Sequence, residues 1–328
     1  MTRITEQQLR RTLVSDLRQN REFVNRYSAE LSSGYAVSVP GDSNVSGTVA
    51  QFREALDKIA GYKQRISTVT SVLSLQDEVT SQANEVLIRA KEIATQAASE
   101  TNDPANRAQL ANEVWQLRDQ LASLANTQYQ GRYIYGCADD DDPPYDPQTY
   151  AVPATGSAST RYAFDNESGT SDTRSVKITD DLTITVNTPA DELFGNAMSA
   201  LERLGRALDG YDTLPASGAP DGSGAAFNLP GDFAAQTAAI QNAINLLDTA
   251  RTTDIMPERV ALGGKLKRLD GAMSVLEMSE TNAKSVLARL QDADYAESAS
   301  NLTQAQTALQ ASYTVTTRVL SLSILDYL

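Results

Sequence analysis

The stretch FREALDKIAGYKQRISTVTSVLSLQDEVTSQANEVLIRAKEIATQA, residues 52–97, repeats apolar or small side chains every seven positions. Two lines of such residues lie three positions apart, as on the contact face of helices packed as a coiled coil. The first line holds Phe52, Ile59, Ile66, Leu73, Thr80, Leu87 and Ala94, and the second holds Tyr62, Val69, Ala83, Ala90 and Ala97. The pattern predicts one helix over about residues 48–100, which at 1.5 Å per residue is about 80 Å long. We therefore expect a rod of long helices rather than a globule.

Helices are also predicted on both sides of this stretch. Residues 2–33 are expected to form a helix that Gly34 ends, since glycine adopts the left-handed conformation common at that position. Pro104 suits the first turn of a further helix, which Asp103 can cap. That helix should fold back on the long one as an antiparallel hairpin.

The second half of the chain returns to helix. Leucine and alanine recur at helical spacing over residues 191–209, and a helical pattern resumes at residue 233 and continues to the end of the chain. A break is expected near Asp254–Pro257. A heptad line lets this half pair with the long helix of the first half; it holds Leu262, Leu269, Leu276, Ala283 and Leu290.

Residues 131–190 interrupt the helices with a β-rich insert. Strands are predicted at Arg132–Tyr135, Ser175–Thr179 and Leu182–Val186. Twelve acidic and four basic residues between 131 and 195 give this region −8 of the chain's formal charge of −14. We expect such an acidic, loop-rich insert to face solvent.

The order of these segments predicts a mainly α fold with a β-rich insert. The expected architecture is an elongated, coiled-coil-like antiparallel helical rod, with the N- and C-terminal helices paired and an outer β domain. Three domains are predicted: a terminal helical assembly domain of residues 1–47 and 291–328, a helical rod domain of 48–130 and 191–290, and an outer acidic β-rich domain of 131–190.

The last helix has an unusual surface for a solvated helix. Residues 298–325 hold one charged residue, Arg318, and are rich in Ser, Thr, Gln and Asn. Such a helix is marginal in water by itself, because serine, threonine and valine are mediocre helix formers. We expect like subunits to bury it on several sides; the alternative is an ordinary core helix of a monomer. The predicted assembly interface holds Leu13, Leu17, Val24, Leu31, Leu302, Leu309, Tyr313, Val319, Leu320, Leu322 and Leu325.

Composition argues against several classes of function. The chain has no histidine, which removes the usual acid–base group of neutral pH, and its one cysteine, Cys137, cannot form an intramolecular disulfide. The acidic balance disfavours nucleic acid, and no stretch is long and apolar enough for membrane insertion. No catalytic, cofactor-binding or metal site is predicted. Gly263–Leu266 lacks the Ser or Thr of a phosphate-binding loop, and Asp139–Asp142 lacks the spacing of a calcium loop.

Blocks near the two ends resemble the signatures of the bacterial flagellin family. Leu31–Gly34, after the N-terminal helix, resembles the N-terminal signature, and Asp292–Glu297 with Asn301–Gln306 resembles the C-terminal one. Within the family, three segments are similar to the members that join hook to filament: Leu124–Gly136, the opening Arg3-Ile4-Thr5, and the ending Leu320–Leu328. Gly41–Asn44 departs from the family's usual turn.

The resemblance implies a structural component of the bacterial flagellum, exported through the flagellar type III apparatus without a cleaved signal peptide and held beforehand by an export chaperone. It implies a ring of like subunits, an adaptor between a hook-side junction protein and the first flagellins. A filament flagellin of the same family is the first alternative, a coiled-coil signalling or adhesion protein is the second, and an enzyme is the weakest.

Overall fold

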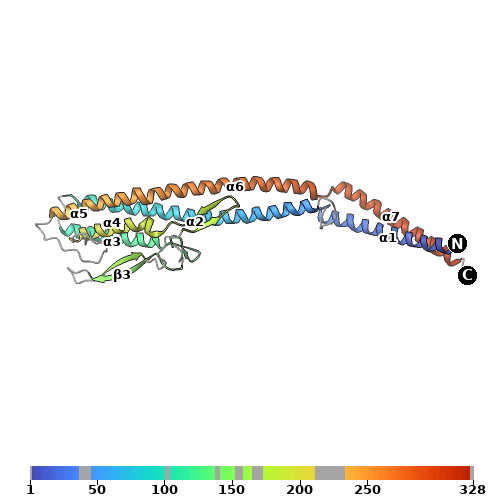
Figure 1. Ribbon diagram of the computed structural model, residues 1–328, viewed down its shortest axis with the longest axis horizontal. Helices are drawn as coiled ribbons and strands as arrows, with labels where there is room; N and C mark the ends of the chain where they lie inside the picture. The colour runs from blue at the N-terminus through green and yellow to red at the C-terminus, as the bar shows by residue number, and fades with distance from the viewer. Residues whose placement is uncertain are drawn as a thin grey trace. The chain divides into compact units, whose positions relative to one another are not determined.

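The computed structural model describes residues 2–36, 46–99, 104–136, 141–151, 158–164, 173–210 and 233–325. Long helices make up most of these residues, with short strands between them, as the sequence predicts (Figure 1). The chain divides into two compact units. We name them the terminal unit, Met1–Gly61 with Val275–Leu328, and the central unit, Tyr62–Ser274.

The described helices and strands follow the predicted order. The helices are α1 (Thr2–Ser33), α2 (Ser46–Ala97), α3 (Pro104–Ala125), α4 (Ala190–Leu208), α5 (Phe233–Ala250), the π-helix η1 (Arg251–Ile255), α6 (Met256–Gln291) and α7 (Tyr295–Leu325). The described strands pair antiparallel as β1 (Gln128–Tyr129) with β2 (Arg132–Tyr133), β3 (Tyr145–Ala151) with β4 (Ala158–Phe164), and β5 (Ser175–Lys177) with β6 (Thr183–Thr185). The strand predicted at Arg132–Tyr135 stops after two residues, because Ile134 and Tyr135 lie in a turn. Asp103 and Cys137 lie outside the described residues.

The central unit has a continuous hydrophobic core. The first heptad line of α2 is buried from Ile66 onward, and Leu73, Thr80, Leu87 and Ala94 are each at most 1% exposed. The predicted stripe of α4 is buried in the core of this unit; it holds Leu193, Ala197, Leu201, Leu204 and Leu208. The ring of Phe194 packs edge-on against that of Tyr135 at 5.0 Å between centroids. Four helices, α2 to α5, thus contribute to one core.

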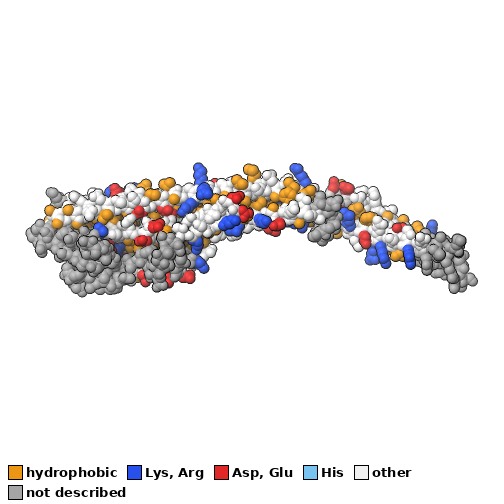
Figure 2. All heavy atoms as spheres, viewed as in Figure 1, with side chains coloured by type: hydrophobic (Ala, Val, Ile, Leu, Met, Phe, Trp, Pro, Cys, Tyr) orange, Lys and Arg blue, Asp and Glu red, His pale blue; other side chains and the backbone are white. Residues whose placement is uncertain are grey.

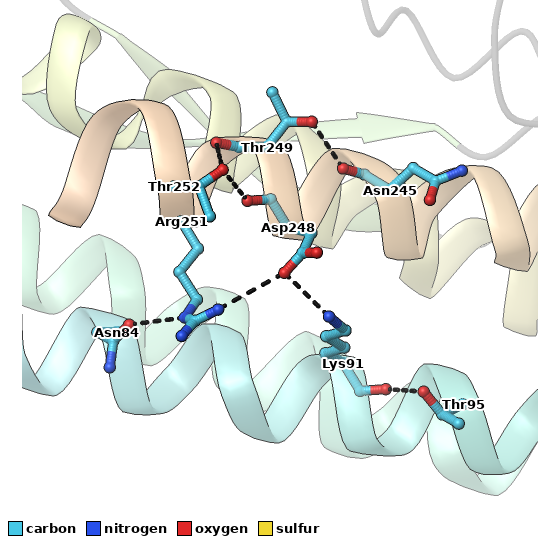
Figure 3. Close-up of polar contacts among 8 residues, drawn as sticks. All are labelled: Asn84, Lys91, Thr95, Asn245, Asp248, Thr249, Arg251 and Thr252. Carbon is cyan, nitrogen blue, oxygen red and sulfur yellow. Dashed lines mark hydrogen bonds and ion pairs between the residues drawn. The ribbon is translucent and has the colours of Figure 1, made fainter. Parts of the chain in front are cut away.

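Helix α2 runs antiparallel to the continuous helix made of α5, η1 and α6. Three polar contacts fix this direction, because residue numbers fall on α2 as they rise on its partner. They join Lys91 to Asp248 (2.9 Å), Asn84 to Arg251 (3.0 Å) and Asp77 to Arg259 (3.6 Å). Figure 3 shows the first two contacts, with Arg251 reaching down to both Asn84 and the carboxylate of Asp248.

The predicted helix break near Asp254–Pro257 is wrong, because the helix continues there through η1. Proline has no N–H, and its ring clashes with the carbonyl four residues earlier in a regular α-helix. The wider π turn just before Pro257 accommodates it, with the Met256 N–H donating to the Arg251 carbonyl five residues back. The Asn196 side chain also donates to Asp254 at 3.0 Å. The actual interruption lies at residues 292–294, between α6 and α7.

A buried glutamine anchors the strand-containing segments to α2. Gln76, at 1% exposure, occupies the one position of the second heptad line that the apolar pattern skips. Its side-chain amide donates to the carbonyls of Ile134 (3.3 Å) and Val186 (2.9 Å). The Tyr135 hydroxyl donates back to the Gln76 carbonyl at 3.2 Å. Because buried carbonyls must be hydrogen-bonded, this one side chain ties two connecting segments to the helix.

Candidate assembly interface

The candidate site is the pair of helices α1 and α7 in the terminal unit. Gly34 ends α1 with φ +78°, and its N–H donates to the Glu30 carbonyl at 2.8 Å, as predicted for a glycine cap. Helix α7 begins at an aspartate cap. Asp294 accepts hydrogen bonds from the backbone N–H groups of Ala296 (2.9 Å) and Glu297 (3.2 Å).

The two sequence blocks that resemble family signatures meet at this place. Tyr35 and Asp292 form an isolated antiparallel β-bridge. The Ala36 N–H donates to the Gln291 carbonyl at 2.7 Å, and the Ala293 N–H donates to the Gly34 carbonyl at 2.9 Å. A Cβ at Gly34 would lie 3.0 Å from the Tyr295 hydroxyl, which is a second reason for glycine there. These segments therefore fix where α1 and α7 begin to pair.

Beyond the bridge, α1 and α7 run antiparallel, side by side (Figure 1). Glu30 is 8% exposed, and its carboxylate accepts from Ser298 at 3.1 Å and from Arg26 at 3.0 Å. Further along, the Asn20 side chain donates to the Ser312 hydroxyl at 2.8 Å. We call this contact between α1 and α7 the seam. Polar contacts thus set the register of the two helices at both of these levels of the seam.

The predicted interface residues divide into three groups. Six are half-buried on the two helices: Leu13, Leu17, Val24, Leu31, Leu302 and Leu309. Tyr313 is 49% exposed. Val319, Leu320, Leu322 and Leu325 belong to α7, but their side chains lie outside the described residues. Their role in assembly stays a prediction.

Sequence reasoning missed several exposed apolar side chains on the same two helices. Val14, Phe23 and Val315 are 46%, 37% and 48% exposed. Each of the three lies off the heptad stripe that faces the other helix. An apolar residue off that stripe was the sequence signal that could have indicated exposed apolar surface. Together with Tyr313 they leave apolar surface on the sides of α1 and α7 that the seam does not cover.

The hydroxyl groups of α7 are largely satisfied within the helix itself. Five threonines donate to the carbonyl four residues earlier, at 2.7–3.0 Å: Thr303, Thr307, Thr314, Thr316 and Thr317. A hydroxyl bound to its own helix leaves the methyl group as the outward part of the side chain. The surface of α7 is therefore less polar than its composition suggests, which lowers the cost of burying it against a partner.

Two absences hold for the described ranges. No helix within them combines the length and apolar character needed to cross a membrane. No three His, Cys, Asp or Glu side chains there are grouped so that they could hold a metal ion.

Comparisons with known proteins agree on one family. The bacterial flagellin N-terminal helical region matches residues 4–136, and the bacterial flagellin C-terminal helical region matches residues 238–328. Flagellar hook-associated protein 3 of Escherichia coli is 26% identical over 304 residues, which is 91% of each chain. The protein of the same name from Salmonella typhimurium is 28% identical over 149 residues, 45% of this chain and 47% of that one.

Solved structures show the same fold. The flagellar hook associated protein-3 of Legionella pneumophila superposes with a TM-score of 0.57 at 15% identity, covering 74% of this chain and 98% of that one. FlgL of Bacillus cereus gives 0.54 at 15% identity, covering 73% and 99%.

Proposed function

The chain belongs to the bacterial flagellin family, and from this premise we propose that it is the structural adaptor that joins the flagellar hook to the filament. The observation that carries the proposal is the 26% identity to a hook-associated protein 3 over 91% of both chains. A partial match would support only shared helical ends, whereas this one includes the central unit. The role is structural rather than catalytic, in keeping with a chain that has no histidine.

The α1–α7 pair supplies the means of assembly in this proposal. Within the described residues α1 and α7 pack chiefly on each other, which leaves much of their surface exposed, and that surface carries Phe23, Tyr313 and Val315. Burying an exposed apolar side chain contributes about 1.5–3 kcal/mol. Like subunits arranged in a ring cover these side chains on more than one face, together with the predicted leucines at the end of α7.

The remaining elements of the proposal concern location and partners. The protein is exported without a cleaved signal peptide, held beforehand by a chaperone, and assembles outside the cell between a hook-side junction protein and flagellin. The functional division into an assembly domain (1–47 and 291–328), a rod domain (48–130 and 191–290) and an outer acidic β-rich domain (131–190) belongs to the same proposal. The outer domain faces solvent in this proposal, because its ten acidic and four basic residues give it −6 of the chain's formal charge of −14.

A filament flagellin is the alternative that an experiment must separate. Deleting the gene for a junction adaptor leaves hooks intact but releases flagellin into the medium, because the filament has nothing on which to start. Deleting a flagellin instead leaves hooks with no flagellin released. The measurement is electron microscopy of the deletion strain together with flagellin quantified in the medium.

Antibody labelling of wild-type flagella gives the matching positive test. An adaptor labels as one band at the hook–filament boundary, whereas a flagellin labels along the filament. Filaments of normal length on the deletion strain, or label distributed along the filament, would show that the adaptor assignment is wrong.

A further inference from the structure

One face of α6 in the central unit is apolar, exposed and uncovered. Met256 is 44% exposed and Val260 is 77% exposed, and helical spacing places Gly264, Lys267 and Gly271 on the same side. The opposite side of the helix carries Leu262 and Leu269, both fully buried. Figure 2 shows hydrophobic side chains exposed along the edge of the molecule where α6 runs. A face like this costs solubility unless something covers it.

The glycines of this face have no explanation within the described chain. A Cβ added at Gly263, Gly264 or Gly271 would meet no atom within 4 Å. Glycine in a helix interior is destabilising relative to alanine, so each exposed glycine lowers the stability of α6, and no contact within the described chain offsets that loss. Because glycine has no side chain, such positions allow a neighbouring backbone or side chain to approach the helix closely.

A groove of matching length lies between α2 and α3 of the same unit. It has a volume of about 480 Å³ and is open to solvent. Val86 and Leu117 contribute apolar surface, and Glu78 and Glu85 contribute carboxylates. From Glu78 to Arg89 the groove follows about 16 Å of helix, the same length as the α6 face from Met256 to Lys267.

The charges of the two surfaces are complementary. Arg89 in the groove is neutralised by Glu113 at 2.7 Å and Glu92 at 3.1 Å. Glu78 accepts only an amide hydrogen bond, from Gln82, and neither it nor Glu85 forms an ion pair within the described residues. The groove therefore has excess negative charge.

The exposed cations of α6 are equally uncompensated. Lys267 and Arg268 are exposed and adjacent, and neither forms an ion pair with a described residue. Two cations without an ion pair beside an apolar helix face thus match two carboxylates without an ion pair in a mainly polar groove, whose apolar surface comes from Val86 and Leu117. Complementary charges of this kind select a partner and its register.

We propose that the α6 face around Met256, Val260 and Lys267 docks into the α2–α3 groove of a second copy of this chain. Because the two surfaces differ and lie on one molecule, the contact is heterologous, and heterologous contacts close into rings when the rotation allows. The inference rests on the proposed adaptor function, to which it adds the lateral contact between neighbours.

Cysteine cross-linking on isolated flagella tests the contact directly. In a Cys137→Ser chain expressed in the deletion strain, Ser81→Cys marks the groove and Val260→Cys marks the face. We expect the double variant to give a ladder of oligomers of this chain with a short bismaleimide. Co-expression of the two single variants, one chain with Ser81→Cys and the other with Val260→Cys, should give dimers only. Each chain then carries one reactive cysteine and can be cross-linked to one neighbour. The control variant combines Ser81→Cys with Gln241→Cys. Gln241 is exposed on α5, outside the proposed contact, so this variant should give no ladder.

Charge reversal provides an independent test. Lys267→Glu with Arg268→Glu should lower incorporation into flagella at least about tenfold, and so should Glu78→Lys with Glu85→Lys. All four changes together should restore incorporation. All these side chains are exposed or at the groove surface, and the unfolding transition of each purified chain checks that it folds.

Several outcomes would overturn the inference. One is that the Val260→Cys variant forms cross-links without a marked groove, and another is that the double variant is cross-linked only to a different protein. The third is that no ladder forms although the wild-type chain is located at the hook–filament boundary. Wild-type chain absent from that boundary would instead refute the adaptor function itself, so the two failures are distinguishable.

Discussion

The terminal and central units are both made of long helices, but they bury them to different degrees. In the central unit, α2 to α5 enclose one core, and the apolar stripe of α4 is almost fully buried. In the terminal unit, α1 and α7 pack as a pair, and leucines such as Leu17 and Leu309 on their seam are only half-buried. The two units share a helical pattern, so the pattern alone does not determine how much stability each obtains from its own chain.

The difference indicates where each unit finds its stability. Apolar burial is the main favourable term in folding, and ordering each residue costs roughly 1–2 kcal/mol of backbone entropy. In the central unit, burial of the unit's own apolar side chains offsets this entropy cost. The α1–α7 pair buries less, and α7 has only two charged residues, Glu297 and Arg318. We propose that neighbouring subunits supply the burial that the pair lacks.

The sharpest test of the comparison is the same substitution in both units. Leu201→Asp places a carboxylate in the closed core of the central unit, and we expect it to lower the free energy of unfolding by more than about 3 kcal/mol. Leu309→Asp on the half-buried seam should change it by less than about 0.5 kcal/mol. Urea unfolding followed by circular dichroism measures both.

Incorporation into flagella should separate the same two variants in a second way. Leu309→Asp should fold as a monomer and yet be absent from isolated flagella, because the half-buried carboxylate would lose its remaining water when neighbouring subunits pack around α1 and α7. Equal loss of stability from both substitutions would mean that the seam is part of a preformed core.

Glycine substitutions probe the same contrast with a smaller change. A Cβ at Gly205 on α4 would lie 2.7 Å from the Trp115 ring, so Gly205→Ala should destabilise the central unit by about 1–3 kcal/mol. Gly61 of α2, in the terminal unit, has nothing within 4 Å of such a Cβ. Gly61→Ala should therefore stabilise the helix by roughly 0.5–1 kcal/mol. Thermal unfolding midpoints that move in the same direction would refute this difference.

Alkaline pH should act on the central unit through its buried tyrosines. Burial raises the pKa of Tyr135 above its ordinary value of 10.0, helped by the carboxylates of Glu258 and Asp77. Because the folded-state pKa is the higher one, stability is constant below about pH 10 and falls as the pH rises above it. Tyr135→Phe should make that fall less steep at a cost of about 0.5–1.5 kcal/mol at neutral pH, from the lost hydrogen bond to Gln76. Urea unfolding at a series of pH values measures the slope, and an unchanged slope would contradict the assignment.

The sequence was sufficient to predict most helices, because heptad spacing reports burial directly. Ile66, Leu73 and Leu87 are buried as their spacing requires. It was misleading at Pro257, since a proline predicts a break but does not indicate that a π turn can absorb it. It also gave no sign of what the buried amide of Gln76 binds, because its partners are two backbone carbonyls distant in the chain.

The pairing of α1 with α7 was predictable from the sequence, whereas their role as an assembly interface stays a prediction. A near-chargeless helix indicates burial, but one sequence does not distinguish a seam within the chain from a contact between chains. The six half-buried leucine and valine positions lie on the α1–α7 pair, whereas the exposed Phe23 and Val315 fall outside the heptad. The bridge between Tyr35 and Asp292 joins residues far apart in sequence, and no local pattern specifies such a contact.

Amide hydrogen exchange on the purified monomer tests most directly whether α1 and α7 depend on assembly for their stability. Amides open locally with free energies that follow the packing around them, so a completed core protects its helices and an incomplete one does not. We expect α1 and α7 to reach full exchange while α3 and α4 remain protected. Equal protection in α1, α7 and the central helices would contradict the account, because the α1–α7 pair would then be stable without any neighbour.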